Sequence, residues 1–402
     1  MAEDNIRPFR TRDAQNVPTE EERALHKKIR RHRLGGRAAI VVLLLAAAIL
    51  IAYFYMDYQR KTYSNYSIIE WNELSGMENS NSVSFGGNIL RYNKDGVAYV
   101  DYTNAQIWNQ PYEMGSPMLD VSDQAAAVAD KGGNKIYLFD EKGLTGEIDT
   151  VLPIQKIAVS DADTVAVLLK DGSVSRVNYY NKSGEVISEM KIGMDNMGYP
   201  MAMDVSPDGK MFMLSFLSVS GGSLDTVISY YNFGNVGQEY KDRLVKSKTY
   251  EDSVFPEVEF LDDSTSVAYG DTMACIYKGS QIPEESATIT FAQEIQSVFS
   301  DATHLGFILS NDKEGAPYLV EVYNLSGKKI FSEDVSLAYT QVKLDREKVI
   351  LFNDTEFSVY SLSGIHKFEG EYESTIKDVI STNKQSRYII ITPTEMDKIK
   401  LE

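Results

Sequence analysis

The feature of the sequence that most limits its fold is a short strand that recurs at a nearly regular interval. Eight apolar runs that end in a small or acidic residue begin at Ser82, Met118, Ile154, Met201, Val258, Ile295, Thr340 and Ile376. Successive runs start 36 to 57 residues apart, and the residues between them form further short runs separated by Gly, Asn, Asp and Ser turns. A period near 40 residues with about four strands per unit is typical of a β-propeller, in which each unit forms one blade. We therefore predict an all-β ring.

The number of blades depends on how the ring closes. Seven units are complete, but the eighth has room for only three strands between Ile376 and Glu402. A strand over residues 66–72 would supply the missing outer strand and would remove an exposed sheet edge. We predict eight blades, with seven as the alternative.

Three units share a turn sequence before their outer strand. Residues 180–184, 323–327 and 360–364 read YNKSG, YNLSG and YSLSG. Glycine adopts a positive φ without steric cost, so we expect each of these glycines in the left-handed region of a tight turn.

An apolar segment precedes the repeats. From Ala38 to Met56 the chain has 19 consecutive residues without a charge. As a helix they would cover roughly 28 Å, enough to cross the hydrocarbon core of a bilayer. Tyr53, Phe54, Tyr55 and Tyr58 suit a membrane interface, whereas a cleaved signal peptide would have a shorter apolar core and a small-residue cleavage site. We predict a transmembrane helix over residues 38–56.

The charges beside this segment predict its orientation. Ten basic and six acidic residues precede Asp57, which leaves 30 basic and 52 acidic residues after it. The positive-inside rule then places residues 1–37 in the cytoplasm, and a linker over 57–65 and the ring over 66–402 outside the membrane. Because the exterior part is strongly acidic, we expect no nucleic-acid partner.

The cytoplasmic tail has its own helix signal. Thr19 and Glu22 form a capping-box pattern, so we expect a short juxtamembrane helix from about Glu20 to Leu34. Its basic residues are candidates for contact with anionic lipids or a partner protein: Lys27, Lys28, Arg30, Arg31, Arg33 and Arg37. The alternative is that they act only as a topology signal.

The sequence shows no recognisable catalytic set. Cys275 is the single cysteine, and the two histidines in the predicted ring, His304 and His366, are far apart, so we predict no metal or cofactor site. Aspartates at or just after the first strand of six of the units could meet on one face, where they would bind calcium or act as an acid and base pair on a glycan. The simpler interpretation is that these aspartates begin turns. They are Asp120, Asp123, Asp161, Asp163, Asp204, Asp208, Asp262, Asp263, Asp301 and Asp345.

The fourth unit is longer than its neighbours. We assign its insertion to residues 233–250, which carry aromatic and basic side chains on an otherwise acidic ring. Long insertions on a propeller are frequent recognition sites. We predict an interaction loop that contacts a partner protein or an anionic wall polymer, with a plain solvated loop as the alternative. Its residues are Tyr240, Lys241, Arg243, Lys246 and Lys248.

Several segments resemble known proteins. Residues 206–210 read SPDGK, a turn common in WD40-like and quinoprotein-like propellers. The tail, the span and residues 92–101, 107–114, 130–144 and 231–240 together resemble a membrane-anchored family of Gram-positive anaerobes whose function is unknown. The resemblance implies the fold and the topology and carries over no catalytic residues.

Two functions compete on this basis. The first is an interaction or scaffold module at the cell surface, anchored by one span, with a protein or a cell-wall polymer as its partner. The alternative is a glycan-active hydrolase or lyase that uses channel-facing carboxylates. A paired-carboxylate pocket in the channel would favour the enzyme. A quinone-cofactor enzyme is disfavoured, because vicinal cysteines and a tryptophan-docking repeat are missing.

Overall fold

A computed structural model describes residues 19–402 except 75–76, 78–79, 173, 193–197 and 221. The chain divides into two compact units, Met1–Lys61 and Thr62–Glu402.

The first unit contains one helix, α1 (Glu20–Arg60). The predicted capping box is confirmed: the Glu22 backbone N–H donates to Thr19 Oγ1 over 3.4 Å, and the Thr19 N–H donates to Glu22 Oε2 over 3.0 Å. The predicted tail helix and the predicted span are parts of this one continuous helix, because no proline interrupts residues 20–60. Within α1, Val42–Arg60 is long and apolar enough to be a candidate membrane span.

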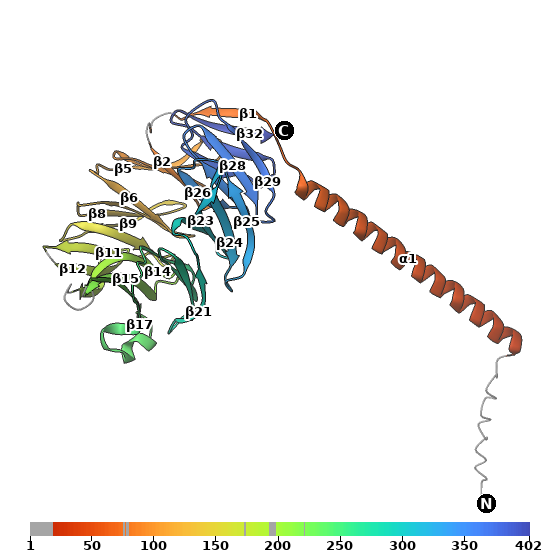
Figure 1. Ribbon diagram of the computed structural model, residues 1–402, viewed down its shortest axis with the longest axis horizontal. Helices are drawn as coiled ribbons and strands as arrows, with labels where there is room; N and C mark the ends of the chain where they lie inside the picture. The colour runs from red at the N-terminus through yellow and green to blue at the C-terminus, as the bar shows by residue number, and fades with distance from the viewer. Residues whose placement is uncertain (1–18, 75–76, 78–79, 173, 193–197, 221) are drawn as a thin grey trace, which may run out of the picture. The chain divides into compact units, whose positions relative to one another are not determined.

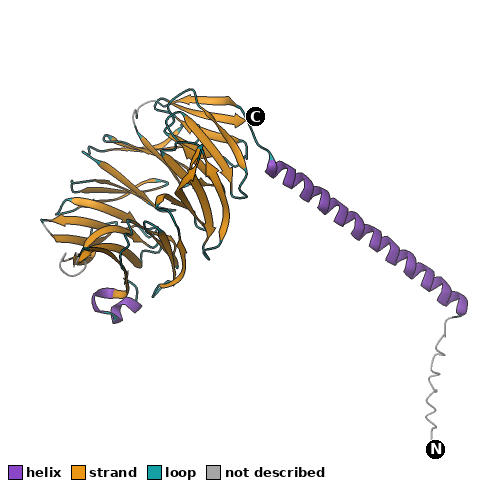
Figure 2. Ribbon diagram, in the orientation of Figure 1, coloured by secondary structure: helices purple, strands orange, loops and turns teal. Residues whose placement is uncertain are grey.

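The second unit consists of eight four-stranded antiparallel sheets, as predicted (Figures 1 and 2). Blade 1 contains β2 (Asn81–Phe85), β3 (Asn88–Tyr92), β4 (Gly96–Val100) and β5 (Gln106–Pro111). Blade 2 contains β6 (Pro117–Val121), β7 (Ala126–Asp130), β8 (Lys135–Asp140) and β9 (Gly143–Asp149). Blade 3 contains β10 (Ile154–Val159), β11 (Thr164–Asp171), β12 (Val174–Asn181) and β13 (Val186–Ile192). Blade 4 contains β14 (Tyr199–Val205), β15 (Met211–Ser220), β16 (Ser223–Asn232), the 3-10 helices η1 (Val236–Glu239) and η2 (Lys241–Arg243), and β17 (Leu244–Tyr250).

The remaining blades repeat this pattern. Blade 5 contains β18 (Glu257–Asp262), β19 (Thr265–Tyr269), β20 (Met273–Lys278) and β21 (Glu284–Thr290). Blade 6 contains β22 (Ile295–Ser300), β23 (His304–Lys313), β24 (Ala316–Asn324) and β25 (Lys329–Val335). Blade 7 contains β26 (Gln341–Asp345), β27 (Lys348–Phe352), β28 (Glu356–Ser361) and β29 (His366–Glu371). Blade 8 contains β30 (Asp378–Ser381), β31 (Arg387–Ile391), β32 (Glu395–Leu401) and β1 (Tyr66–Glu73).

The ring closes through the first and last strands of the unit. β1 pairs antiparallel with β32, from Tyr66 opposite Leu401 to Glu73 opposite Glu395. The N–H groups of Ser64 and Asn65 also donate to the Glu402 carbonyl. Figure 1 shows β1 beside β32, so the predicted closure and the blade count are confirmed.

The hydrophobic core lies between the blades. Eight clusters of buried residues each combine side chains of two neighbouring blades, including one that joins blade 8 to blade 1. The first strands of neighbouring blades contact one another, as β6 does with β10 and β10 with β14, so they form the inner wall of the ring. Because each sheet buries both faces against its neighbours, its middle strands are continuous apolar runs.

The repeated turns have the expected geometry. Gly184, Gly327 and Gly364 each have a φ of 77°. In the first two turns the side-chain oxygen of Asn181 or Asn324 accepts hydrogen bonds from backbone N–H groups two and four residues later. These asparagines act as local turn formers.

Candidate functional site

The two faces of the ring differ in what they carry. In a four-stranded antiparallel blade, the turns after the first and third strands lie on one side and the turn after the second strand lies on the other. Residues 62–65 lead into the start of β1, which lies next to the end of β32. On that side of the ring, the backbone N–H groups of Ser64 and Asn65 donate hydrogen bonds to the Glu402 carbonyl. We call this side, with its first and third turns, the linker face.

Several of the predicted aspartates hold neighbouring blades together. Asp120 Oδ2 accepts a hydrogen bond of 2.7 Å from the Val159 N–H of blade 3. Asp204 Oδ2 accepts one of 2.6 Å from the Phe260 N–H of blade 5. Each of these carboxylates satisfies a backbone donor of the next blade, and is therefore part of the ring's structure.

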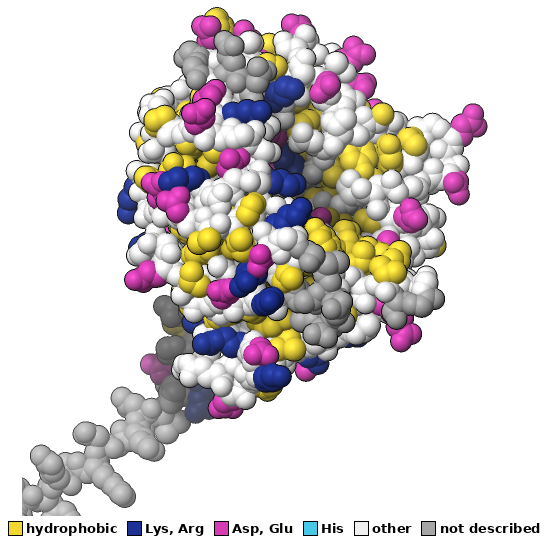
Figure 3. Space-filling model, turned by 90° about the vertical axis from the view of Figure 1, so that its left-hand side faces the viewer, with side chains coloured by type: hydrophobic (Ala, Val, Ile, Leu, Met, Phe, Trp, Pro, Cys, Tyr) yellow, Lys and Arg dark blue, Asp and Glu magenta, His cyan; other side chains and the backbone are white. Residues whose placement is uncertain are grey.

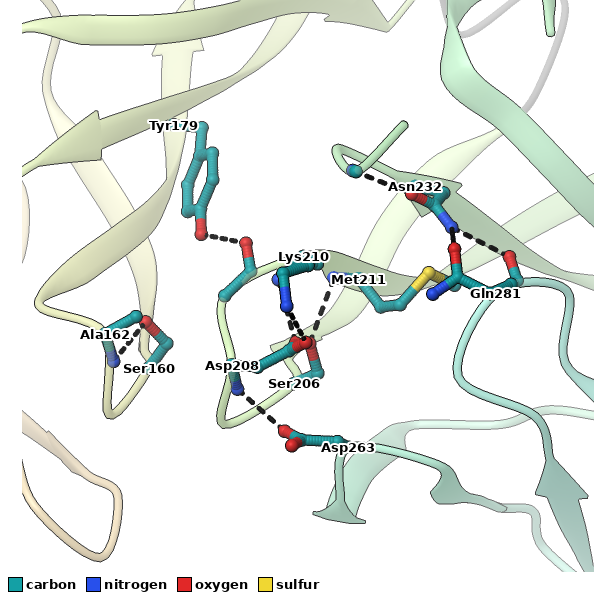
Figure 4. Close-up of polar contacts among 12 residues, drawn as sticks. Ser160, Ala162, Tyr179, Ser206, Asp208, Lys210, Met211, Asn232, Asp263 and Gln281 are labelled. Atoms are coloured by element: carbon teal, nitrogen blue, oxygen red, sulfur yellow. Dashed lines mark hydrogen bonds and ion pairs between the residues drawn. The ribbon is translucent and has the colours of Figure 1, made fainter. Parts of the chain in front are cut away.

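The same role recurs at the turns of the linker face. The Asp208 N–H in the SPDGK turn donates over 2.8 Å to Asp263 Oδ1 of blade 5, and Tyr179 of blade 3 donates its hydroxyl hydrogen to the Gly209 carbonyl (Figure 4). Between blades 2 and 3, the Gln124 N–H donates over 2.8 Å to Asp161 Oδ1. The turn sequence thus serves to lock adjacent blades.

Three of the other predicted aspartates, Asp163, Asp262 and Asp301, make contacts within their own blades. Asp262 and Asp301 accept from N–H groups two residues further on, and Asp163 forms a 3.0 Å ion pair with Lys182. These contacts support the interpretation of the aspartates as turn and contact residues.

Two of the predicted aspartates on inner strands, Asp120 and Asp204, have raised pKa values. Burial raises the pKa of Asp120 to about 6. Burial, and next the charge of Asp120, raise the pKa of Asp204 well above its usual value. The two groups are therefore within electrostatic reach of each other, yet each keeps one oxygen on a backbone N–H of the next blade.

A pocket of about 300 Å³ lies at the mouth of the channel on the linker face. Its lining comes from blades 7, 8, 1 and 2 and includes Tyr102, Asp123, Asp345 and Arg346. Asp345 Oδ2 accepts a 2.7 Å hydrogen bond from the Ser381 N–H. Because Asp345 is committed to blade 8, the arrangement argues against an acid and base pair with Asp123.

The histidines do not meet. His304 Nδ1 lies 3.2 Å from Asp301 Oδ1 in blade 6, and His366 Nε2 lies 2.9 Å from Ser358 Oγ in blade 7. Among the described residues, no group of three or more His, Cys, Asp or Glu side chains is arranged to hold a metal ion.

The predicted insertion is shorter than expected. Residues 244–250 are the outer strand β17, so the boundary at residue 250 was wrong and the insertion covers 233–243. Lys246 and Lys248 lie on β17, where each forms a 2.5 Å ion pair with Glu284 and Glu285 of β21, respectively. These residues form a strand because the blade needs a full outer strand to complete its sheet. The glutamates at the start of β21 neutralise the two lysines of β17. The expected basic patch is therefore divided.

The remaining predicted residues lie in the insertion itself. Lys241 is exposed, and the Tyr240 side chain is 38% exposed. The Arg243 guanidinium lies 5.2 Å from the centre of the Phe233 ring, and its Nη1 donates to the Phe233 carbonyl over 3.4 Å. Arg243 is thus held against the base of the insertion.

A groove of about 430 Å³ separates this insertion from blade 3. One wall is the outer strand β13, through Ser188, Glu189, Met190 and Lys191. The other wall is formed by Tyr231, Asp242, Arg243 and Leu244 of blade 4. The unusual length of the fourth unit predicted the wall that blade 4 forms. The wall formed by β13 was not predicted, because the sequence of an outer strand does not show what lies beside its edge.

The basic residues of the tail are only partly described. Lys27 and Lys28 are exposed on α1. The side chains of Arg30, Arg31, Arg33 and Arg37 lie outside the described residues.

The surface charge of the ring is mixed. Figure 3 shows hydrophobic, acidic and basic side chains interspersed on the side of the ring that it presents.

Comparisons with known proteins agree with the fold. Residues 59–401 match the family of unknown function DUF5711. The chain is similar to BamB from Moraxella catarrhalis, with a TM-score of 0.51, 11% identity and coverage of 84% of this chain and 100% of that one. It is also similar to Sqt1 from Saccharomyces cerevisiae, with a TM-score of 0.51, 9% identity and coverage of 82% and 99%. No curated protein matches the sequence. At such low identity, these likenesses concern the fold alone.

Proposed function

Since the chain belongs to the DUF5711 family of unknown function and folds as an eight-bladed β-propeller, we propose that it is an interaction module tethered to the cell membrane. In this proposal, α1 anchors the protein, the tail of residues 1–37 is cytoplasmic, the span covers 38–56, and a linker over 57–65 leads to an extracytoplasmic ring over 66–402.

The sequence around the span supports this topology. The large apolar side chains from Val42 to Met56 are exposed on α1, as lipid-facing side chains would be. The basic residues of the tail precede the span, which favours a cytoplasmic N-terminus. Lys27, Lys28, Arg30, Arg31, Arg33 and Arg37 would then lie close to anionic lipids. The segments that resemble a membrane-anchored family of Gram-positive anaerobes favour a location at the surface of such a cell.

The observation that carries the interaction role is the groove between β13 and the insertion of blade 4. It lies on a rigid ring whose inner-strand aspartates Asp120 and Asp204 already serve as contacts between blades. A rigid scaffold that presents one irregular insertion is suited to recognition.

The charges of the insertion favour a protein partner over an anionic wall polymer. Lys241 and Arg243 are interspersed with Glu239 and Asp242, so this segment carries no net charge. Lys246 and Lys248 are paired with glutamates. A polyanion would gain little from such a surface, whereas a protein surface can match charges of both signs.

Site-specific photo-crosslinking in intact cells tests this function. A photoreactive benzoylphenylalanine would replace Tyr240 in the insertion or, as a matched control, exposed Glu314 at the hairpin tip between β23 and β24. We expect a discrete adduct with another protein from position 240 and none from position 314. The same pattern from both positions, or no adduct from 240, would contradict the proposal.

A further inference from the structure

We propose that the groove binds an extended peptide segment of the partner, which adds to β13 as a fifth strand of blade 3. This inference rests on the proposed interaction role and names the form in which the partner is recognised.

The outer strand β13 has an exposed edge. In the strand order of its sheet, β13 is last, and four consecutive residues of it, Ser188–Lys191, line the groove. Along an edge strand, alternate residues turn their N–H and C=O groups outward, and these groups are a template for another strand. The groove therefore offers main-chain hydrogen bonds along one wall.

Two apolar side chains are exposed on β13, just before the residues that line the groove. Val186 and Ile187 of β13 are 50% and 49% exposed. Proteins usually protect such edges with charges, prolines or a covering segment. An apolar edge beside a groove is what strand addition requires.

The neighbouring outer strands show the contrast. Between β17 and β21, two ion pairs and a 2.5 Å hydrogen bond from the Tyr250 hydroxyl to Glu285 Oε2 bridge the blades. On β13, by contrast, Glu189 forms an ion pair with Arg176 of its own blade. The groove beside β13 has a volume in the range of ligand-binding clefts, about 300 to 1,000 Å³.

The opposite wall suggests the side chains of the peptide. Tyr231 is 6% exposed and firmly packed, while Met190 and Leu244 are half-buried. Together they form an apolar strip, flanked by the charged groups of Lys191, Asp242 and Arg243. We expect the bound segment to place an apolar side chain on this strip, with polar residues on either side. The flexible side chain of Met190 can adapt to the anchor residue.

The test uses the full chain in phosphatidylcholine nanodiscs and a random dodecamer phage library, with empty nanodiscs for counter-selection. Selected peptides would be synthesised, and their affinities measured by fluorescence polarisation. Met190→Glu, or the more exposed Lys191→Glu, should weaken binding at least about tenfold, the effect of losing a central contact. Ile330→Glu, an equivalent change at a 41% exposed residue of β25, should leave affinity within about twofold. Amide hydrogen exchange should show protection of β13 on binding.

Three outcomes would overturn the inference: no peptide enriched over empty nanodiscs, binding that survives both charge substitutions, or protection that falls outside β13. Self-association of the chain that Met190→Glu abolishes would assign the groove to a second copy and would also overturn it. The two proposals can fail separately. A crosslink from position 240 without peptide binding would support the interaction role and overturn only the strand-addition inference. Peptide binding without a crosslink from position 240 would contradict the interaction role in the cell.

Discussion

The ammonium group of Lys398 lies 2.8 Å from the carboxylate of Glu70, and this ion pair joins two strands at opposite ends of the ring's sequence. Three apolar side chains of β32, Met396, Ile399 and Leu401, are each at most 1% exposed, and buried Asp397 accepts a hydrogen bond from the Tyr372 hydroxyl. Closure thus depends on buried packing and strand pairing, with the ion pair at its surface.

The first prediction concerns this closure. Deleting Met396 to Glu402 removes four buried side chains, three of them apolar, and the partner of β1, so the free energy of unfolding should fall by roughly 6 kcal/mol or more. Glu70→Ala removes only the exposed ion pair and should change the free energy of unfolding far less, because solvent screens such a pair. Urea unfolding of the full chain in detergent measures both. Equal effects would show that the ring does not depend on this closure.

The second prediction concerns pH. Because the pKa of Asp120 is raised to about 6, the folded ring binds more protons than the unfolded chain between about pH 4 and pH 6. The stability contributed by this group is therefore lost as the pH rises through that window. Asp120→Asn should reduce this pH-dependent loss of unfolding free energy by up to about 3 kcal/mol, because a pKa raised by about two units corresponds to that amount.

A control of opposite sign accompanies this change. Hydrogen bonding and charge from Lys313 lower the pKa of Asp334, so its contribution is lost as the pH falls through the acid range. Asp334→Asn should flatten the acid side of the profile and leave pH 5 to 7 unchanged. Melting temperatures from pH 3 to 7 distinguish the two variants. Parallel profiles for Asp120→Asn and the parent would contradict the assignment.

The third prediction concerns the SPDGK turn. Gly209 has a φ of 68°, and a Cβ atom there would lie 2.8 Å from the Tyr179 hydroxyl of blade 3. Gly87, in the equivalent turn of blade 1, has a φ of 80° and open space around its Cα. Gly87→Ala should cost about 1 kcal/mol for the backbone alone. Gly209→Ala should cost about 2 kcal/mol more, because it also disturbs the contact between blades.

Thermal unfolding of both glycine variants measures the difference. If the two substitutions cost the same, the turn would not lock the blades.

The fold was predictable because its signals are local and repeated. Alternating short strands and turns recur in every unit, and the shortage of one strand after Ile376 pointed to residues 66–72. The contacts between blades were not predictable, since they join residues tens of positions apart. Nothing in the sequence around Asp120 shows that its partner is the Val159 N–H.

A second recurring feature escaped the sequence pattern. In blades 1 to 7 the register between the third and fourth strands shifts at a buried aromatic residue, such as Tyr99, Phe139 or Tyr277. Such bulges twist the outer strand, and they depend on a partner strand whose register the sequence alone does not show.

The candidate site was predicted in part. The excess length of the fourth unit located the insertion, but Lys246 and Lys248 were assigned to a loop because their partners, Glu284 and Glu285, lie in the next unit. Charge on a propeller surface is paired across blades, so a local count of lysines overestimates a basic patch.

The most direct test of the account is the side of the membrane on which the ring lies. Cys275 is fully buried, so a membrane-impermeant maleimide should report on an introduced cysteine. In intact cells, Glu314→Cys on the blade 6 hairpin should be labelled, whereas Glu21→Cys near the start of α1 should be labelled only after permeabilisation. Labelling of position 21 in intact cells, or of position 314 only after permeabilisation, would contradict an extracytoplasmic interaction module.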